Sequence, residues 1–204
     1  MKSIIKKYSH AWVFLYFFIY MPWFLWLEQN ITVNYTNVAT SLDRLIPFCE
    51  WFVIPYFLWF GYIAITIAYF FFTSKSDFYK CCAFLFTGMT ICLIIYTVWP
   101  NGQDLRPTTF TRDNLLIDIV KSLYSTDTAT NVCPSIHVFN SIGAYIAIAN
   151  SKKLSSNKGI VLGSLILTIL ISLSTVFLKQ HSLFDGICSL ALSAVLYVLV
   201  YKVD

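Results

Sequence analysis

The stretch from Gly159 to Tyr201 reads GIVLGSLILTILISLSTVFLKQHSLFDGICSLALSAVLYVLVY. It consists of two apolar runs, about 159–178 and 183–201, and each is close to the roughly 20 residues that a membrane-spanning helix needs. A short polar break separates the runs and contains His181, with Asp185 four residues further on. Ionisable groups are costly near a bilayer core and are retained there mostly for function. The stretch therefore predicts two membrane helices with a functional site where they meet.

The composition of the whole chain indicates a polytopic membrane protein. Of its 204 residues, 58% are hydrophobic and only 12% are charged, whereas a soluble domain is nearer half apolar and about one-quarter charged. The length suits a single domain, 1–204. The fourth of the expected spans is short, which implies little tilt or a start within the outer interface. We expect an all-α fold with six transmembrane helices, at about 11–27, 51–73, 81–99, 135–150, 159–178 and 183–201.

The distribution of lysine and arginine predicts the orientation. Nine of the 14 basic residues, among them Lys2 and Lys6, fall on segments at one side of the membrane, against the two acids Asp77 and Asp204. Basic residues are in excess in short cytoplasmic loops, so we expect this side to be cytoplasmic and to hold both termini. The basic residues are scattered over these loops, so the net charge of +4 does not indicate nucleic-acid binding.

Two long loops on the outer side are the expected carriers of function. They cover about 28–50 and 100–134, and long loops on one face of a scaffold often hold binding and catalytic residues. In the first loop, residues 43–50 are expected to form a short helix that lies at the membrane interface. Asp43 and Glu50 are candidates to reach the site from this loop.

The His181 and Asp185 pair is the first candidate for chemistry. The two residues are at positions i and i+4, which share one face of a helix. The carboxylate can hold one ring nitrogen of His181 and leave the other nitrogen free to attack, as in a nucleophile with an orienting group. The alternative is a polar pair that only caps the last helix. Lys179, two residues before His181, is a candidate for binding phosphate.

A second histidine follows in Pro134-Ser135-Ile136-His137. Proline is favoured at the first helical position, and the free N–H groups at a helix start bind anions. Ser135 adds a hydroxyl donor, and His137 can protonate a leaving alkoxide, a role worth about 10²–10⁴ in rate. The alternative is a helix cap with an interfacial histidine.

An arginine in the second outer loop completes the set. Arg106 stands in Arg106-Pro107, and an arginine can grip phosphate oxygens with two parallel hydrogen bonds. A solvated or headgroup-facing charge is the alternative; Arg112 and Arg44 are weaker candidates. Arginine and both histidines come from separate segments that are all predicted at the outer interface. Together they indicate phosphoryl chemistry at a membrane surface.

These residues resemble the motifs of the type 2 phosphatidic acid phosphatase superfamily, which includes lipid phosphatases, sphingolipid headgroup transferases and vanadate haloperoxidases. Its motifs are Lys, six residues, Arg-Pro; Pro-Ser-Gly-His; and Ser-Arg, five residues, His, three residues, Asp. The corresponding residues here are Trp99 with Arg106-Pro107, Pro134-Ser135-Ile136-His137, and Ser174-Thr175 with His181 and Asp185. The six-helix layout is also similar, so the resemblance covers most of the chain.

The resemblance implies a mechanism by position. His181 would be the nucleophile and form a phosphohistidine, Asp185 would orient it, and His137 would protonate the leaving oxygen. The residues that would bind phosphate are Arg106, Ser135 and the amides near Ile136 and His137, with Lys179 as a further cation.

Two departures from the motifs remove positive charge, because Trp99 replaces the motif lysine and Thr175 replaces the motif arginine. A phosphate monoester carries close to two negative charges at neutral pH, and a diester carries one. The departures therefore favour a diester or a diphosphate substrate. Ile136, in place of glycine, adds bulk beside the phosphate site.

No cofactor is expected. The six cysteines have no metal-ligand spacing, no carboxylate cluster suggests a metal, and the superfamily needs none. Cys49 and Cys133 lie near the predicted outer face, and their pairing stays open, although no other feature indicates a disulfide framework.

We expect an integral lipid phosphatase of the plasma membrane that acts at the extracytoplasmic face. Its substrate would be a phospholipid or a polyprenyl phosphate, such as phosphatidic acid, phosphatidylglycerophosphate or a polyprenyl diphosphate. A lipid headgroup phosphotransferase or phosphodiesterase is the first alternative, and a non-enzymatic membrane protein is the second. The oligomeric state does not follow from the sequence.

Overall fold

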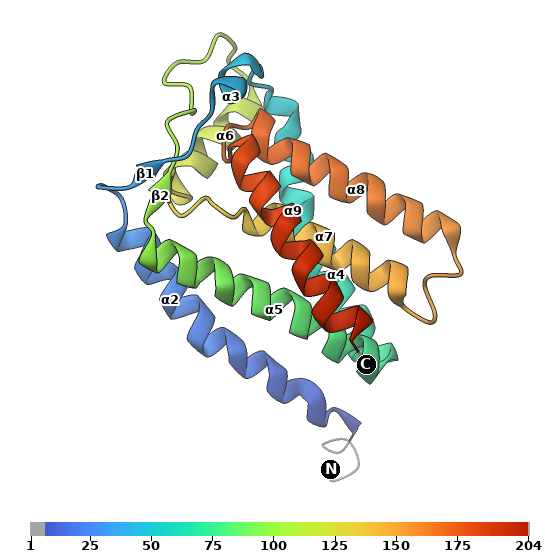
Figure 1. Ribbon diagram of the computed structural model, residues 1–204. Coiled ribbons are helices and arrows are strands. Elements are labelled where there is room, and N and C mark those ends of the chain that lie inside the picture. The colour runs from blue at the N-terminus through green and yellow to red at the C-terminus, as the bar shows by residue number, and fades with distance from the viewer. Residues whose placement is uncertain (1–6, 204) are drawn as a thin grey trace.

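The computed structural model describes residues 7–203 as a bundle of helices with one short pair of parallel strands (Figure 1). Lys2, Lys6 and Asp204, which contribute to the predicted orientation, lie outside these residues. The elements in chain order are η1 (Ser9–Tyr16), α2 (Phe17–Asn30), β1 (Thr36–Asn37), α3 (Ser41–Leu45), η2 (Glu50–Phe52), α4 (Val53–Thr73), α5 (Lys75–Val98), β2 (Asn101–Gly102), α6 (Leu115–Thr126), α7 (Ile136–Asn150), α8 (Lys158–Phe177), α9 (Leu183–Tyr197) and η3 (Val198–Lys202).

Within residues 7–203, five helices are long and apolar enough to cross a membrane, which indicates a membrane protein. They are Ser9–Asn30, Glu50–Thr73, Lys75–Val98, Lys158–Phe177 and Leu183–Lys202. The all-α class is confirmed, but the expected count of six spans is not. The stretch expected at 135–150 is α7, which has 15 residues and is therefore about 22 Å long, shorter than a hydrocarbon core of about 30 Å.

α7 lies among the other helices and packs against α4, α5, α8 and α9 (Figure 1). The segment that leads into it, 130–135, is buried but not helical. Asn101 satisfies this backbone: its Oδ1 accepts from the N–H groups of Val132 (3.0 Å) and Cys133 (2.8 Å), and its Nδ2 donates to the Cys133 carbonyl (3.1 Å). Non-helical backbone is tolerated at membrane depth where protein buries it. A short helix after a buried loop can therefore occupy this position.

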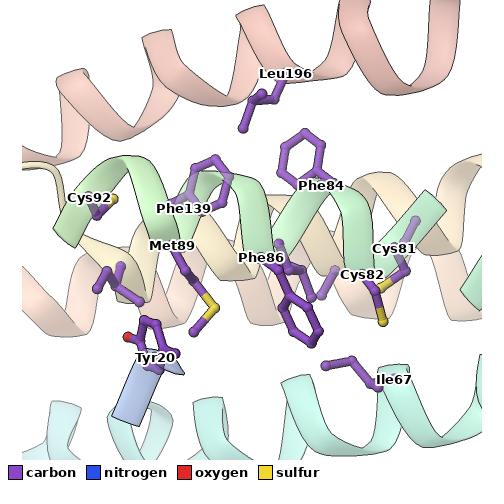
Figure 2. Packing of buried hydrophobic residues seen from close by; sticks show 14 of the residues in the cluster. Tyr20, Ile67, Cys81, Cys82, Phe84, Phe86, Met89, Cys92, Phe139 and Leu196 are labelled. Carbon is purple, nitrogen blue, oxygen red and sulfur yellow. The ribbon is translucent and has the colours of Figure 1, made fainter. Parts of the chain in front are cut away.

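Close approach of two helices forms the centre of the core (Figure 2). The rings of Phe84 and Phe139 stack with centroids 5.1 Å apart. A Cβ at Gly88 would lie 2.0 Å from the Phe139 ring, and one at Gly143 would lie 2.6 Å from Leu85. Small residues let helix backbones approach closely in membrane proteins. These two glycines therefore allow α5 and α7 to pack against each other.

The two long loops contain more structure than expected. The helix expected at 43–50 is found in part, as the five-residue α3 followed by η2, and its position at a membrane surface stays a prediction. α6 is not among the expected elements. Asn114 caps α6 by accepting from the Ile117 N–H, and Val120 packs against Val53 and Tyr56 at the start of α4. The apolar period of α6 is visible in the sequence but is too short to signal a span.

We expect Gly88→Ala to lower the free energy of unfolding by about 1–3 kcal/mol, because Phe139 is already stacked on Phe84 and the added methyl group overpacks the core. The matched control is Gly61→Ala in α4, where a Cβ meets nothing within 4 Å. Alanine there is expected to stabilise the helix by about 0.5–1 kcal/mol. Thermal melts in detergent measure both variants. Equal melting temperatures would contradict the close packing of α5 on α7.

Candidate active site

The turn between α8 and α9 forms the centre of the site. Ser182 is the N-cap of α9, and its Oγ accepts from the Asp185 N–H (3.2 Å). The Asp185 carboxylate in return accepts from the Ser182 N–H (2.8 Å), which completes a capping box. His181 therefore lies just before the helix, whereas the i, i+4 spacing predicts that it shares a helix face with Asp185. The capping box is what brings the carboxylate of Asp185 next to the His181 ring.

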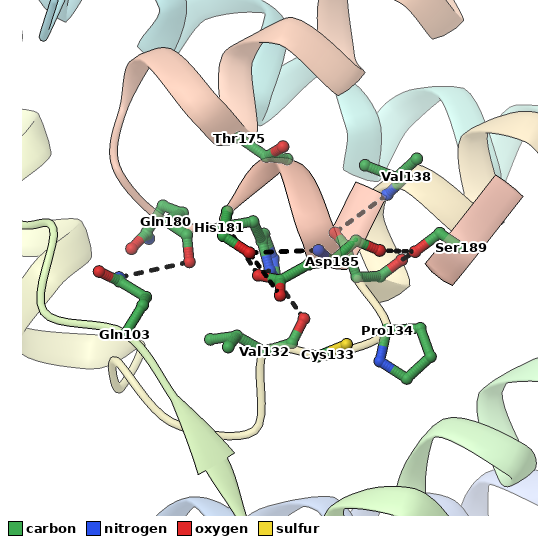
Figure 3. Close-up of polar contacts among 12 residues, drawn as sticks. Gln103, Val132, Cys133, Pro134, Val138, Thr175, Gln180, His181, Asp185 and Ser189 are labelled. Carbon is green, nitrogen blue, oxygen red and sulfur yellow. Dashed lines mark hydrogen bonds and ion pairs between the residues drawn. The ribbon is translucent and has the colours of Figure 1, made fainter. Parts of the chain in front are cut away.

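Contacts at Nδ1 fix the His181 ring (Figure 3). This nitrogen lies 3.0 Å from the Val132 carbonyl oxygen and 3.3 Å from Asp185 Oδ2. A carbonyl and a carboxylate only accept hydrogen bonds, so Nδ1 carries the ring proton and Nε2 carries the lone pair. The hydrogen bond at Nδ1 orients the ring and fixes which nitrogen carries the lone pair. The Nε2 atom can therefore attack an electrophile.

His137 faces His181 from the start of α7. The two ring centroids are 5.7 Å apart. The His137 ring also contacts Tyr56, at 4.6 Å, and Trp59, at 4.4 Å between centroids. The aromatic contacts hold the second imidazole beside the first, so one bound group can touch both rings.

The start of α7 differs in detail from the expectation. Ser135 is the N-cap, and its Oγ accepts from the Val138 N–H (3.3 Å). The helix begins at Ile136, so Pro134 precedes the cap instead of taking the first helical position. Ser135 is fully buried and is not among the residues that line the cavity described next, whereas Ile136 is.

Both histidines line a cavity of about 770 Å³ whose walls are mainly apolar side chains of α2, α4 and α5. His137 contacts Tyr56, and the Tyr56 hydroxyl bonds Asp127 at the end of α6. The histidines therefore lie on the side of the cavity that α6 lines. Four wall residues are between 43% and 55% exposed: Met21 and Leu25 on α2, and Phe57 and Phe60 on α4. The cavity therefore opens on the flank of the bundle between α2 and α4, where a membrane helix faces hydrocarbon.

Arg106 lies beside the site but does not line the cavity. Its guanidinium donates to the carbonyls of Asp127 and Thr128 (2.8 Å each) and of Tyr124 (3.2 Å), and to Gln180 Oε1. Burial lowers the pKa of Arg106, and the Asp127 carboxylate acts in the opposite direction. The arginine thus holds the end of α6 against Gln180, the residue before His181, and its Nη groups are already occupied.

Lys179 is also directed away from the cavity. Its Nζ donates to the carbonyls of Asp43 (2.6 Å) and Ile46 (2.5 Å), and burial lowers its pKa while Asp43 acts in the opposite direction. Its backbone has a positive φ of 54°, which reverses the chain between α8 and the His181 turn. Lys179 is not among the residues that line the cavity, and its binding of phosphate stays a prediction. The lysine ties the first long loop to the site.

Trp99 and Thr175, which replace the lysine and the arginine of the motifs, do not line the cavity either. Trp99 donates from Nε1 to Thr36 Oγ1 (3.1 Å). Thr175 is buried and donates to the Ser172 carbonyl (2.8 Å). Across residues 7–203, no lysine or arginine side chain lines the cavity.

Two carboxylates do line it. Glu28 accepts from the Thr128 N–H (3.1 Å), from its hydroxyl (2.6 Å) and from Asn131 Nδ2 (3.1 Å). Asp127 accepts from the Tyr56 hydroxyl (3.1 Å) and from Gln180 Nε2 (3.2 Å). The polar end of the cavity is therefore rich in acceptors of hydrogen bonds.

Sequence reasoning did not single out Glu28, Asn101, Asp127 or Gln180. Asn101 shapes the loop whose Val132 carbonyl holds His181, and Gln180 links that turn to Arg106. Polar residues of these types are common at helix ends and in loops. Only Gln180 could have been selected from the sequence, because it directly precedes His181.

The remaining candidates, Asp43, Glu50 and Arg112, do not line the cavity. Asp43 Oδ1 accepts from the Leu183 N–H at the start of α9 (2.7 Å), so the first loop does reach the site, although as support. Glu50 pairs with Arg112 (2.9 Å), and neither lines the cavity. Cys49 and Cys133 are free thiols, so the disulfide left open by the sequence does not form.

A metal is not suggested by the side chains described. Between residues 7 and 203, no group of three or more histidine, cysteine, aspartate or glutamate side chains is arranged to hold a metal ion.

Comparison with known proteins adds one finding. A sequence model of the PAP2 superfamily matches residues 84–204, a range that includes His137, His181 and Asp185. No curated protein and no solved structure gives a significant match.

We expect Lys179→Met to destabilise the fold by about 1–3 kcal/mol, because it leaves two carbonyls without their charged donor. The matched control is Lys121→Met. Lys121 is half-exposed; its Nζ pairs with the exposed carboxylates of Asp113 and Asp118 and lies 5.9 Å from the Phe110 ring centroid. Such surface pairs contribute at most about 1 kcal/mol. Thermal melts compare the two variants. A smaller loss for Lys179→Met than for Lys121→Met would refute the structural role of Lys179.

Proposed function

Since the chain belongs to the PAP2 superfamily, whose members are phosphatases and phosphotransferases, we propose that it is a lipid phosphatase that works through a phosphohistidine. Membership supports phosphatase-type chemistry. The lipid, the covalent intermediate and the membrane face are part of the proposal.

One observation carries it: two imidazoles, 5.7 Å apart, line the polar end of an apolar cavity that opens on the flank of the bundle. A phosphate between the rings would leave its hydrocarbon chain in the apolar part. The chain would enter from the side, between α2 and α4. A water-soluble phosphate ester would leave most of this cavity unfilled.

The proposed reaction has two steps. His181 Nε2 attacks the phosphorus, the bond from phosphorus to the lipid oxygen breaks, and His137 gives its proton to that oxygen. Water then attacks the phosphohistidine and gives a proton to His137, and orthophosphate leaves with His181 restored. Asp185 and the Val132 carbonyl stabilise the positive charge that develops on the His181 ring.

A second candidate is a lipid headgroup phosphotransferase or phosphodiesterase, in which an alcohol replaces water or the phosphate is a diester. The absence of lysine and arginine from the cavity lining within residues 7–203 favours a substrate of low charge. The same covalent step through His181 serves both candidates.

The proposed location is the plasma membrane, with the site at the extracytoplasmic face. η1 begins and η3 ends at the end of the bundle opposite α3 and α6 (Figure 1), together with the lysines of the short loops. The excess of lysine at that end supports a cytoplasmic assignment for it.

We expect His181→Ala to reduce orthophosphate release from phosphatidic acid or a polyprenyl diphosphate by about 10⁴-fold or more, because the nucleophile is lost. Purified protein in detergent and a phosphate assay measure this. The control is His10→Gln, which removes an imidazole that bonds the Phe71 carbonyl and does not line the cavity. Turnover retained in His181→Ala would end the nucleophile assignment. If the unmodified protein releases orthophosphate from neither substrate but cleaves a phosphodiester, the second candidate is favoured.

We expect His137→Ala to lose about 10²–10⁴-fold on the natural lipid and far less on a nitrophenyl phosphate ester, whose leaving group needs no proton. Comparison of kcat on the two substrates tests the role. An equal loss on both would show that His137 is not the general acid.

A further inference from the structure

Two buried polar atoms near His137 have no hydrogen-bond partner. They are Trp59 Nε1, which only donates, and Asn140 Oδ1, which only accepts. Asn140 is 1% exposed. Buried polar groups are normally paired, and an unpaired one in a native structure needs an explanation.

Both residues line the cavity that contains the two histidines. Asn140 follows His137 by three residues on α7, which places it on the same face and about 4.5 Å further along the helix. Trp59 comes from α4, and its ring lies 4.4 Å from the His137 ring. The unpaired donor and acceptor therefore approach the cavity from two helices, on the side of His137 that leads away from the polar end.

The surroundings at this depth are apolar. The neighbouring wall residues on α4 and α5 include Ile63, Leu85 and Met89. A simple hydrocarbon chain in this place would leave both polar atoms unpaired, whereas a ligand group that donates and accepts would satisfy both.

We propose that Trp59 and Asn140 form a subsite for a hydroxyl or secondary amide in the backbone of an acylated lipid phosphate. The group accepts from the Trp59 indole N–H and donates to Asn140 Oδ1. It lies a few ångströms from the phosphorus, as the hydroxyl of a monoacylglycerol phosphate does. Polyprenyl and alkyl phosphates have only hydrocarbon there. This inference rests on the proposed function, because it assumes that the phosphate lies between the two histidines.

The test compares two probes of equal chain length, a monoacylglycerol phosphate and an alkyl phosphate. We expect Asn140→Leu to reduce kcat/KM for the monoacylglycerol phosphate about tenfold or more, because a site built to bond a hydroxyl loses its acceptor, and to leave the alkyl phosphate unchanged. Trp59→Phe, which keeps a ring beside His137, is expected to act in the same direction. The matched control is Asn150→Leu on the same helix, where the exposed amide bonds only the Ile146 carbonyl.

A loss confined to the monoacylglycerol phosphate supports the subsite. An equal loss on both probes, or no loss on either, overturns it. A second measurement does not depend on turnover: in a His181→Ala background, the rise in melting temperature with each probe is compared before and after Asn140→Leu. If the unmodified protein releases no phosphate, the proposed function fails, and the melting temperatures still decide the subsite: a selective rise abolished by Asn140→Leu supports it, and equal rises overturn it.

Discussion

A single buried carboxylate holds the site together. Asp185 is fully buried, and its oxygens accept from the N–H and hydroxyl of Ser182 while one of them faces the His181 ring. The backbone carbonyl of Asp185 accepts from the Ser135 N–H (3.4 Å) and from the Ser189 hydroxyl (2.7 Å). A charge this deeply buried is tolerated only when its bonds are complete. The carboxylate therefore fixes the start of α9 and the histidine ring, and the backbone carbonyl of the same residue holds the start of α7.

The fold was predictable where hydropathy alone determines it. Five of the six apolar runs are helices long enough to span a membrane. The run at 135–150 forms the shorter α7, which is not confirmed as a span. Hydropathy alone does not distinguish a helix that faces lipid from one that faces four other helices. α6 was missed for the opposite reason: only one side of it is apolar, and its buried face depends on contact with the start of α4.

The site residues were predictable where the groups that act together are close in the sequence. The spacing of His181 and Asp185 and the sequence around His137 indicated residues that the fold brings together. The partners of Arg106 and Lys179 were not predictable, because a cation near a phosphate motif in the sequence does not indicate which carbonyl groups it bonds in the folded chain. Their partners, in α6 and in the first loop, are 18 to 136 residues away in sequence. No short pattern contains that information.

The cavity is assembled from two parts of the chain. The histidines and Asp185 lie within the range matched by the superfamily, 84–204, whereas α2 and α4, which frame the opening, precede it. The two imidazoles and the frame of the opening therefore come from different stretches, but the two stretches are in contact, because Tyr56 and Trp59 of α4 pack against the His137 ring. Met21, Leu25 and Phe60 line the cavity at its opening. Changes at these three positions can alter the shape of the entrance and leave Tyr56 and Trp59 in place beside His137.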